Sequence, residues 1–345
     1  MRFWHRQGEA RRNTRWLLLA FALCVLAVVA AVHLGLALAW LLAAWMLPGQ
    51  WAYPAGFTAV NVGVTLVLVL GGWWLETDSL RGGGQRLARR VGAREARPGS
   101  SLAEQQLCNI VQEMCIAAHM QAPQVMVLAR TEAINAFAAG WDGDDAKDAV
   151  LAVTQGALEH LTREEMQGLV AHELSHLHEG DTRMNMQLGG MVFGLELVYN
   201  YGDTLRERGG PFWWFGSAIM AAGFVGWLSG HLLKAAVSRQ REFLADARAV
   251  QWTRSRDGLG GVLRKVMTQR QEERRHYGSS GDARSHVGLN HPAVQHMLLV
   301  DAPGGSHLQA WLESHPPLGD RVRRIYGRGM GPLPLRSGMQ PSGVQ

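Results

Sequence analysis

The sequence LTREEMQGLVAHELSHLHEGD, residues 161–181, carries the pattern HExxH at His172, Glu173 and His176. Two histidines four positions apart lie one above the other on a single helical face, so both imidazoles can reach one metal ion. The glutamate between them points beside that face, where its carboxylate can meet a water on the same ion. This stretch therefore predicts a helix with a metal-binding face.

The same stretch contains the signals that begin a helix. Thr162 and Glu165 have the spacing of a capping box, and Leu161 can pack as a hydrophobic staple on Met166. An apolar stripe follows at Leu169, Val170, Leu174 and Leu177. The alternative is a capped surface helix with two incidental histidines, so the rest of the chain must decide.

Charge and composition favour a membrane partner over a nucleic acid. The chain has 345 residues, enough for one large domain or two modest ones, and a net charge of +5. Nearly all its basic residues are arginines, and these crowd next to apolar segments. A basic chain can bind nucleic acid or an anionic membrane surface. Because no basic groove with interleaved aromatic residues lies elsewhere, we expect a lipid bilayer and no nucleic acid as partner.

The three cysteines do not form a disulfide framework. Cys24 lies in an apolar block, whereas Cys108 and Cys115 are seven positions apart on one expected helix. That spacing corresponds to roughly 10 Å along a helix axis, which is too far for a disulfide. The cysteine content therefore indicates a reducing compartment.

Two apolar blocks near the N-terminus predict a transmembrane hairpin. Residues 1–15 contain five arginines and one acidic residue, and no charged residue occurs from Trp16 to Leu47. This block is too long for the apolar core of a cleaved signal peptide. A second block runs from Phe57 to Leu75, and six arginines follow it between residues 81 and 97. Because arginines flank both ends and the turn has no charge, we expect both ends to be cytoplasmic.

A second pair of apolar segments follows the HExxH helix. Met184–Tyr201 is moderately hydrophobic and contains Glu196, whereas Phe212–Leu233 has no charged residue. Joined by the turn at 206–211, the pair predicts a helical hairpin at the membrane. The alternative for the first segment is a buried soluble helix, because Glu196 in a span would be costly unless it faced protein or water.

Other elements follow from apolar periodicity and from glycine and proline positions. We expect helices at Leu102–Met120, Ala235–Trp252, Val262–His276, His291–Val300 and Ser306–Glu313, and strands at Val125–Leu128 and Ala149–Thr154. Gly82–Gly84 reads as part of a linker, Asp142–Asp148 as an acidic turn and Gly278–Gly288 as a polar loop. Two strands followed by a metal-binding helix is the usual order in a zincin fold.

A catalytic zinc site needs a third protein ligand and an open position for water. A metzincin is excluded, because positions 179 and 182 would have to be glycine and histidine. Glu242 fits as the third ligand, since Asp246 lies four residues later on the same helical face and can hold a ligand histidine. The alternative is a solvated charged helix. Glu179, Asp181 and His178 are weaker candidates, with Asp181 at best supporting the site and His178 pointing away from it.

Four ordered motifs resemble the HtpX-like membrane zinc metallopeptidases, which are related to the eukaryotic CAAX prenyl endopeptidase. The matching segments are Asn135–Gly140, His172–His176, Arg239–Asp246 and His315–Pro317. The resemblance covers residues from about 57 to 326 and accounts for the long insertion before Glu242, where the family has a membrane hairpin. The chain departs from the family in its weak segment at 184–201, its long first apolar block and its tail.

The resemblance implies a multi-pass endopeptidase of the bacterial inner membrane, with its N-terminus and catalytic domain in the cytoplasm. It would hold one zinc ion per chain through His172, His176 and Glu242, with Asp246 behind a histidine ligand. Glu173 would act as the general base on membrane or misfolded proteins, as in protein quality control. His315 would stabilise the developing oxyanion, or else only shape a turn.

The resemblance also implies a substrate-binding strand, at Asn135, Ala136 and Phe137. There an extended peptide would pair with the strand backbone. The alternative for Asn135 is a loop asparagine that favours a turn. A further alternative, of another class, is a membrane-embedded scaffold or binding protein whose zinc is structural. The sequence carries no signal for oligomeric state or cleavage preference.

The expected fold is a mainly α membrane protein with a zincin-type α+β catalytic domain. A small β-sheet packs on the HExxH helix, and a second hairpin is inserted between the metal-ligand helices. The segments are a basic N-terminus (1–15), a transmembrane hairpin (16–75), a linker (76–100), two halves of the peptidase domain (101–183 and 235–327), the inserted hairpin (184–234) and a disordered tail (328–345).

Overall fold

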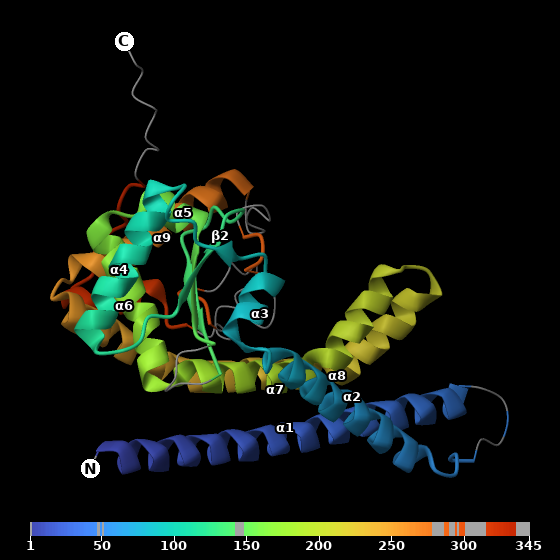
Figure 1. The fold of residues 1–345 in the computed structure, drawn as a ribbon. Coiled ribbons are helices and arrows are strands. Elements are labelled where there is room, and N and C mark those ends of the chain that lie inside the picture. Colours follow the sequence, from blue (N-terminus) through green and yellow to red (C-terminus); the bar gives the residue numbers. More distant parts are fainter. Residues whose placement is uncertain are drawn as a thin grey trace. The chain divides into compact units, whose positions relative to one another are not determined.

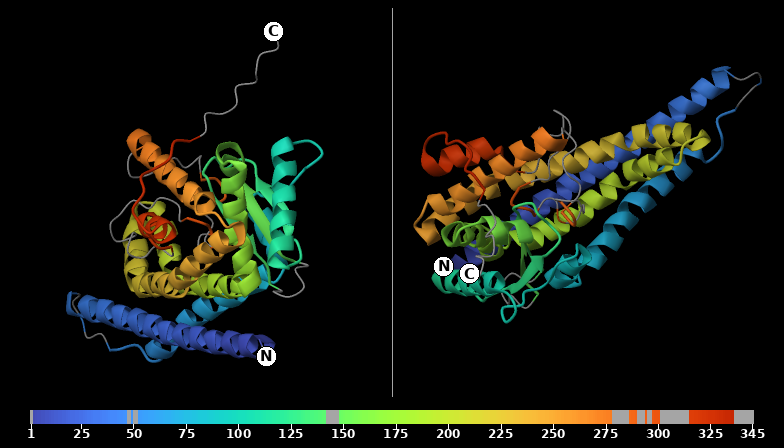
Figure 2. Two further views of the ribbon diagram at one scale, coloured as in Figure 1. Left: turned by 90° about the vertical axis from the view of Figure 1, so that its left-hand side faces the viewer. Right: turned by 90° about the horizontal axis from the view of Figure 1, so that it is seen from above.

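The computed structural model describes residues 2–46, 49, 52–141, 148–277, 286–289, 294, 297–300 and 315–335. The chain divides into two compact units. The helical unit comprises Met1–Ser79 and Gln187–Lys234, and the sheet unit comprises Leu80–Met186 and Ala235–Gln345. Figure 1 and Figure 2 show the elements of both units as ribbons.

The sheet unit is built on four short strands. They are β1 (Arg94–Glu95), β2 (Gln124–Leu128), β3 (Ala136–Ala139) and β4 (Val150–Thr154). Their order in the sheet is β1-β2-β4-β3, with β2 parallel to β4 and both outer strands antiparallel to their neighbours. The sheet is therefore small and mixed. The two strands expected from apolar runs, now β2 and β4, are confirmed, and so is the strand that the resemblance implies at Asn135, now β3.

Both faces of this sheet are covered by helices, which explains why β4 is a continuous apolar run. Leu151 and Val153 face a core shared with α4 (Leu102–Ala118), α6 (Arg163–Glu179) and α9 (Asp257–Tyr277). The alternate residues of β4 face a second core on the side of α3 (Gly83–Arg90). Figure 1 shows α4, α6 and α9 on one side of the sheet and α3 on the other. Two shorter helices, α5 (Gln155–His160) and α12 (Leu318–Tyr326), complete the unit.

The start and end of α6 follow from local sequence. The predicted capping box is present: the Glu165 amide donates to the Thr162 hydroxyl, and the Glu165 carboxylate accepts from the Thr162 amide. The helix ends at Gly180, whose φ of 72° lies in the left-handed region that glycine adopts without strain. These two signals fix the ends of α6.

Residues 76–100, expected to be a linker, carry the end of α2 (Phe57–Leu80), then α3 and β1. The glycine run at 82–84 permits close packing, because a Cβ on Gly84 would lie 2.4 Å from the Ala139 carbonyl oxygen. The Gly84 amide also donates to the Asp148 carbonyl at 3.2 Å. The glycines therefore bring α3 onto the sheet.

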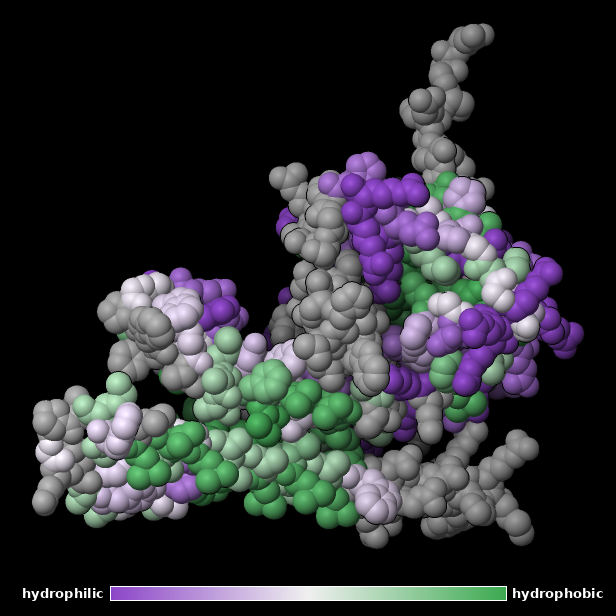
Figure 3. Space-filling view, turned by 180° about the vertical axis from the view of Figure 1, so that it is seen from behind, coloured by the Kyte–Doolittle hydropathy of each residue, from purple (hydrophilic) through white to green (hydrophobic). Residues whose placement is uncertain are grey.

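The first two helices of the helical unit are long and apolar. They are α1 (Arg2–Met46) and α2 (Phe57–Leu80). Within them Trp16–Leu38 and Phe57–Leu80 are, over the described residues, the two stretches long and apolar enough to cross a membrane. Large apolar side chains stay exposed on both helices, as with Leu23 at 67% and Val67 at 72%. Figure 3 shows hydrophobic surface gathered along the long helices, whereas the sheet unit is more hydrophilic.

The other long helices are α7 (Asp181–Glu207) and α8 (Pro211–Thr253). They form the expected helical pair, but their membrane crossing stays a prediction. The prediction of a separate helix at Ala235–Trp252 is wrong, because α8 runs through this region without a break. The sequence LLKAA at the expected boundary contains only good helix formers and no glycine or proline. Likewise α9 starts at Asp257 rather than at Val262.

Glu196 of α7 is buried against α8. Its Oε1 lies 3.3 Å from His231 Nδ1 and 3.4 Å from Lys234 Nζ, and the residue is 6% exposed. An ionisable group in an apolar helix is tolerated when it faces protein and a charged partner. This is the orientation that the sequence required of Glu196.

Several expected segments lie wholly or partly outside the described residues: the acidic turn at 142–148, the polar loop at 278–288, the helices at 291–300 and 306–313, and the end of the tail. The helix expected at 291–300 is wrong at its described end, because residues 297–300 are not helical and Leu298 forms a β-bridge with Phe137. The three cysteines are free, as the sequence predicts.

Candidate metal centre

Three buried side chains meet where α6 faces α8. His172 Nε2 lies 3.3 Å from His176 Nε2 and 3.6 Å from Glu242 Oε2, and His176 Nε2 lies 3.4 Å from Glu242 Oε1. Donors bound at ~2.0–2.2 Å to a tetrahedral ion lie about 3.4 Å apart. The donor set and its spacing therefore fit one metal ion, and the structure brings together the three ligands that the sequence predicts.

The first histidine is held from behind by a buried ion pair. His172 Nδ1 lies 3.1 Å from Asp246 Oδ1, which fixes the ring with Nε2 toward the cluster. Arg321 donates to both oxygens of Asp246, from Nε at 2.9 Å and from Nη2 at 2.6 Å. Arg321 is fully buried, and its Nη1 also lies 3.3 Å from Glu242 Oε2. One guanidinium thus touches both carboxylates of α8.

The second histidine has a different support. His176 Nδ1 lies 3.0 Å from Asp181 Oδ2, at the first residue of α7. Arg241 of α8 forms an ion pair with the other oxygen of Asp181. The Arg241 side chain is 24% exposed, so the ion pair that supports His176 reaches solvent. The ion pair of Arg321 and Asp246 that supports His172 is buried.

Glu173 is placed beside the cluster with its carboxylate unpaired. The residue is 1% exposed, and within the described residues neither oxygen has a hydrogen-bond partner. Burial raises the pKa of Glu173, while the neighbouring His172 and His176 oppose that shift. A buried carboxylate without a donor fits a water held on a metal ion at the same place.

Glu242 has the opposite electrostatic setting. Burial alone would raise the pKa of its carboxyl, but the charges of His315 and Arg321 and the hydrogen bonds from the two histidines bring it well below its usual range. This shift in pKa favours the carboxylate form of Glu242, which is the form that binds a metal ion.

The chain after residue 314 adds another residue to the cluster. His315 is 4% exposed, and its Nε2 lies 3.6 Å from Glu242 Oε1. The structure thus brings His315 to the three donors. Its catalytic role stays a prediction.

The three expected substrate-binding residues lie at the edge of the sheet. Asn135, Ala136 and Phe137 are 3%, 0% and 0% exposed, because the chain's own residues 298–300 lie against them. Their role in substrate binding is untested by this arrangement.

His178 and Glu179 lie outside the cluster. His178 Nδ1 is 3.0 Å from Glu179 Oε1, and Arg248 pairs with Glu179. This matches the expectation that His178 points away from the metal.

Arg241 and Arg321 were not identified from the sequence. Arg241 lies inside the RxREF motif and directly precedes Glu242, so its position could have predicted a role near the metal. Arg321 lies 75 residues after Asp246, and no local pattern connects the two. Only the folded chain shows that this arginine supports the centre.

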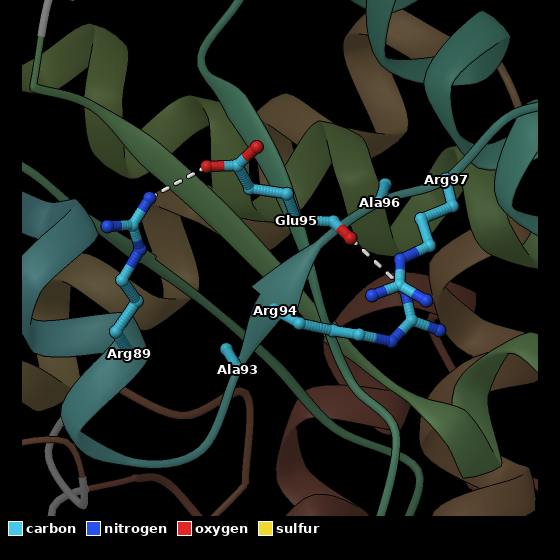
Figure 4. A pocket seen from close by; sticks show the side chains of 6 residues that line it. All are labelled: Arg89, Ala93, Arg94, Glu95, Ala96 and Arg97. Atoms are coloured by element: carbon cyan, nitrogen blue, oxygen red, sulfur yellow. Dashed lines mark hydrogen bonds and ion pairs between the residues drawn. The ribbon is translucent and has the colours of Figure 1, made fainter.

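A surface cleft of about 470 Å³ lies apart from these residues, on the edge strand β1 (Figure 4). Two of its three arginines are paired: Arg89 with Glu95 at 2.7 Å, and Arg94 with Glu104 at 2.6 Å. The cleft holds none of the metal-binding side chains.

The model of peptidase family M48 matches residues 101–328. The chain belongs to peptidase family M48. It is 31% identical to a protease HtpX homologue of Desulfatibacillum aliphaticivorans over 262 residues, which cover 73% of this chain and 76% of the relative. HtpX homologues of Lactobacillus acidophilus and Dictyoglomus thermophilum are 30% and 31% identical, each over 64% of this chain and over 72% and 68% of the relative. No solved structure matches the chain.

Family membership confirms the resemblance drawn from the four motifs. The chain is an HtpX-like M48 metallopeptidase, a hydrolase of peptide bonds, and two of its described helices are apolar enough to span a membrane. Metal dependence is a property of the family, and the His-His-Glu cluster is where this chain can bind the metal.

Proposed function

We propose that the chain is a zinc-dependent endopeptidase in which His172, His176 and Glu242 hold the metal and Glu173 is the general base. The observation that carries the proposal is the unpaired, buried carboxylate of Glu173 beside three donors at tetrahedral spacing. One zinc ion per chain matches this donor set, because two imidazoles and one carboxylate are a common catalytic zinc shell with a position left for water.

The mechanism assigns two proton transfers to Glu173. A bound zinc ion supplies a water with a pKa of about 7 and a Lewis acid for the scissile carbonyl. Glu173 takes a proton as the water oxygen bonds to the carbonyl carbon, and returns it to the amine nitrogen as the C–N bond breaks. Its raised pKa suits a carboxyl group that must both accept and donate a proton.

Two further roles follow from position. His315 donates to the oxygen that becomes negative in the tetrahedral state, because its Nε2 lies 3.6 Å from Glu242 Oε1, beside the metal ligands. Asp181 orients His176 by accepting a hydrogen bond from its Nδ1, and Asp246 orients His172 through the 3.1 Å contact between its Oδ1 and Nδ1.

A membrane scaffold with a structural zinc ion is the second candidate. The observation that favours it is the same His315, since a third imidazole near Glu242 could close a four-ligand shell. A closed shell of four protein ligands would leave no position for water, so Glu173 would have no water to deprotonate.

The proposed location is the bacterial inner membrane, as a multi-pass protein with its N-terminus and peptidase domain in the cytoplasm. The peptidase domain is formed by residues 101–183 and 235–327, with a membrane hairpin at 184–234. Membrane or misfolded proteins are the proposed substrates. Arginines in the first part of α1 and after the end of α2 support this orientation.

Cysteine labelling on intact cells tests the orientation. In a background without native cysteines, Ala55→Cys should react with a membrane-impermeant maleimide. Ser100→Cys, which is exposed on the sheet unit, should react only after lysis. The reverse pattern would overturn the orientation and leave the metal site unaffected.

Glu173→Gln tests the chemistry. The variant should keep about one zinc per chain, while casein cleavage falls by roughly 10²–10⁴-fold through loss of the general base. Glu159→Gln, an exposed glutamate on α5, is the matched control and should cleave at the parental rate. Cleavage retained in Glu173→Gln would remove this residue from the mechanism.

A further inference from the structure

The strand β3 ends the sheet, so only one of its edges is paired with another strand. β4 pairs with it through Ala136–Ala139 on one side. The other edge has the backbone N–H and C=O groups that an extended peptide could use. This edge begins at Asn135, whose backbone is anchored by a hydrogen bond from its amide to Thr154 Oγ1 at 3.0 Å.

The chain itself occupies the start of this edge. Leu298 forms an antiparallel bridge with Phe137. The Leu299 amide lies 3.0 Å from both the Ala136 carbonyl oxygen and Asn135 Oδ1, and donates to them. Asn135 Nδ2 donates to the Val300 carbonyl at 2.9 Å. These are the backbone and side-chain groups that a peptide substrate would need.

The occupying segment, residues 297–300, is docked rather than merely adjacent. Its four side chains are buried, at 5%, 1%, 0% and 4% exposure. Leu298 shares a core with Phe137, whereas Leu299 and Val300 pack in the core that contains α6. Among the described residues, the pair Phe137 and Leu298 forms the bridge that places this segment beside β3.

The same segment is connected to the metal centre. The Leu299 carbonyl accepts from Arg321 Nη1 at 2.7 Å, and Arg321 holds Asp246 behind His172. A peptide that replaces residues 297–300 on β3 would remove this bond. Occupancy of the edge and support of the metal ligand are therefore coupled through one guanidinium.

We propose that residues 297–300 are an internal strand that covers the peptide-binding edge of β3, and that substrate pairs with this edge only by replacing it. The inference rests on the proposed function. It specifies the substrate class: an extended polypeptide whose backbone groups are free, since a folded segment has no donors and acceptors to exchange for those of Leu299 and Val300. In the enzyme without substrate, residues 297–300 occupy the peptide-binding edge of β3.

A reversible cross-link tests the replacement. In a background with Cys24, Cys108 and Cys115 changed to alanine, Phe137→Cys and Leu298→Cys are combined. Directly opposed residues of antiparallel strands have Cα atoms about 4.5–5.5 Å apart, within the range for a disulfide. The oxidised protein should cleave unfolded casein at least 10-fold more slowly than the same protein after reduction, with equal zinc content. Equal rates in both states would overturn the proposal.

A second measurement avoids the loss of the Phe137 ring. Hydrogen exchange is followed in Glu173→Gln with and without saturating unfolded casein. Exchange should rise at 297–300 while β3 stays protected, because peptide takes over its hydrogen bonds. Unchanged or greater protection at 297–300 would show pairing elsewhere and overturn the proposal.

Failure of the proposed function would be seen separately. Cleavage and zinc content of the cysteine-free parent report on the function, whereas the ratio of oxidised to reduced rates reports on the internal strand. A parent without cleavage would count against the endopeptidase, and an active parent with equal rates would count against the strand alone.

Discussion

The two histidines on α6 have carboxylate supports of opposite character. Behind His172, Asp246 and Arg321 are fully enclosed, and the guanidinium makes two hydrogen bonds to one carboxylate. Behind His176, the arginine that holds Asp181 is 24% exposed. In both supports an arginine holds an aspartate that contacts a ligand histidine, but one arginine is buried and the other reaches solvent. The comparison teaches that burial, rather than residue type, should set the cost of removing each arginine.

The largest effect is expected from Arg321→Met. The change leaves the carboxylates of Asp246 and Glu242 and the Leu299 carbonyl buried with no guanidinium, and an uncompensated buried charge costs about 3–5 kcal/mol of stability. Loss of a ligand's supporting partner should also weaken metal binding roughly 10–100-fold. Denaturant unfolding and zinc competition with a chelator measure the two effects.

Arg94→Met is the matched control for that variant. Arg94 also makes two hydrogen bonds to a carboxylate, Glu104, but it is 34% exposed and belongs to β1. It should lower stability by less than Arg321→Met and leave zinc affinity unchanged. Equal losses of zinc affinity in the two variants would break the assignment of Arg321 to the metal centre.

A smaller effect is expected from Arg241→Met. Because this arginine reaches solvent, its pairing with Asp181 should contribute no more than about 1 kcal/mol. Salt screens such a pair, so the difference from the parent in zinc affinity should shrink between about 0.1 and 1 M salt. The effect of Arg321→Met should persist over the same range. Suppose that Arg241→Met lowered stability and zinc affinity as much as Arg321→Met and that salt did not change its effect. The burial of each arginine would then not determine the effect of removing it.

The sequence was most informative where the cause of structure is local. The capping box at Thr162 and Glu165, the apolar run of β4 and the HExxH spacing each act within a few residues, and the structure has all three. Glu242 lies far from α6 in sequence, but its spacing from Asp246 on one helical face made it identifiable.

The errors arise where distant contacts decide. The glycines at the start of α3 suggested a linker, yet Gly84 is needed for the close approach of α3 to the Ala139 carbonyl, which only the folded sheet shows. Arg321 looks like one arginine among several in α12, and only packing makes it the buried one. The break expected before Ala235 came from a change in composition, which carries no helix-stopping signal.

X-ray absorption at the zinc edge of the purified protein tests the central claim most directly. Two imidazole nitrogens and one carboxylate oxygen from the protein, with water completing the shell, are predicted at ~2.0–2.2 Å. The signal of two histidines should remain in Glu173→Gln. A third imidazole, which would be His315, or a sulfur ligand at about 2.3 Å would indicate a different or closed shell and contradict the account.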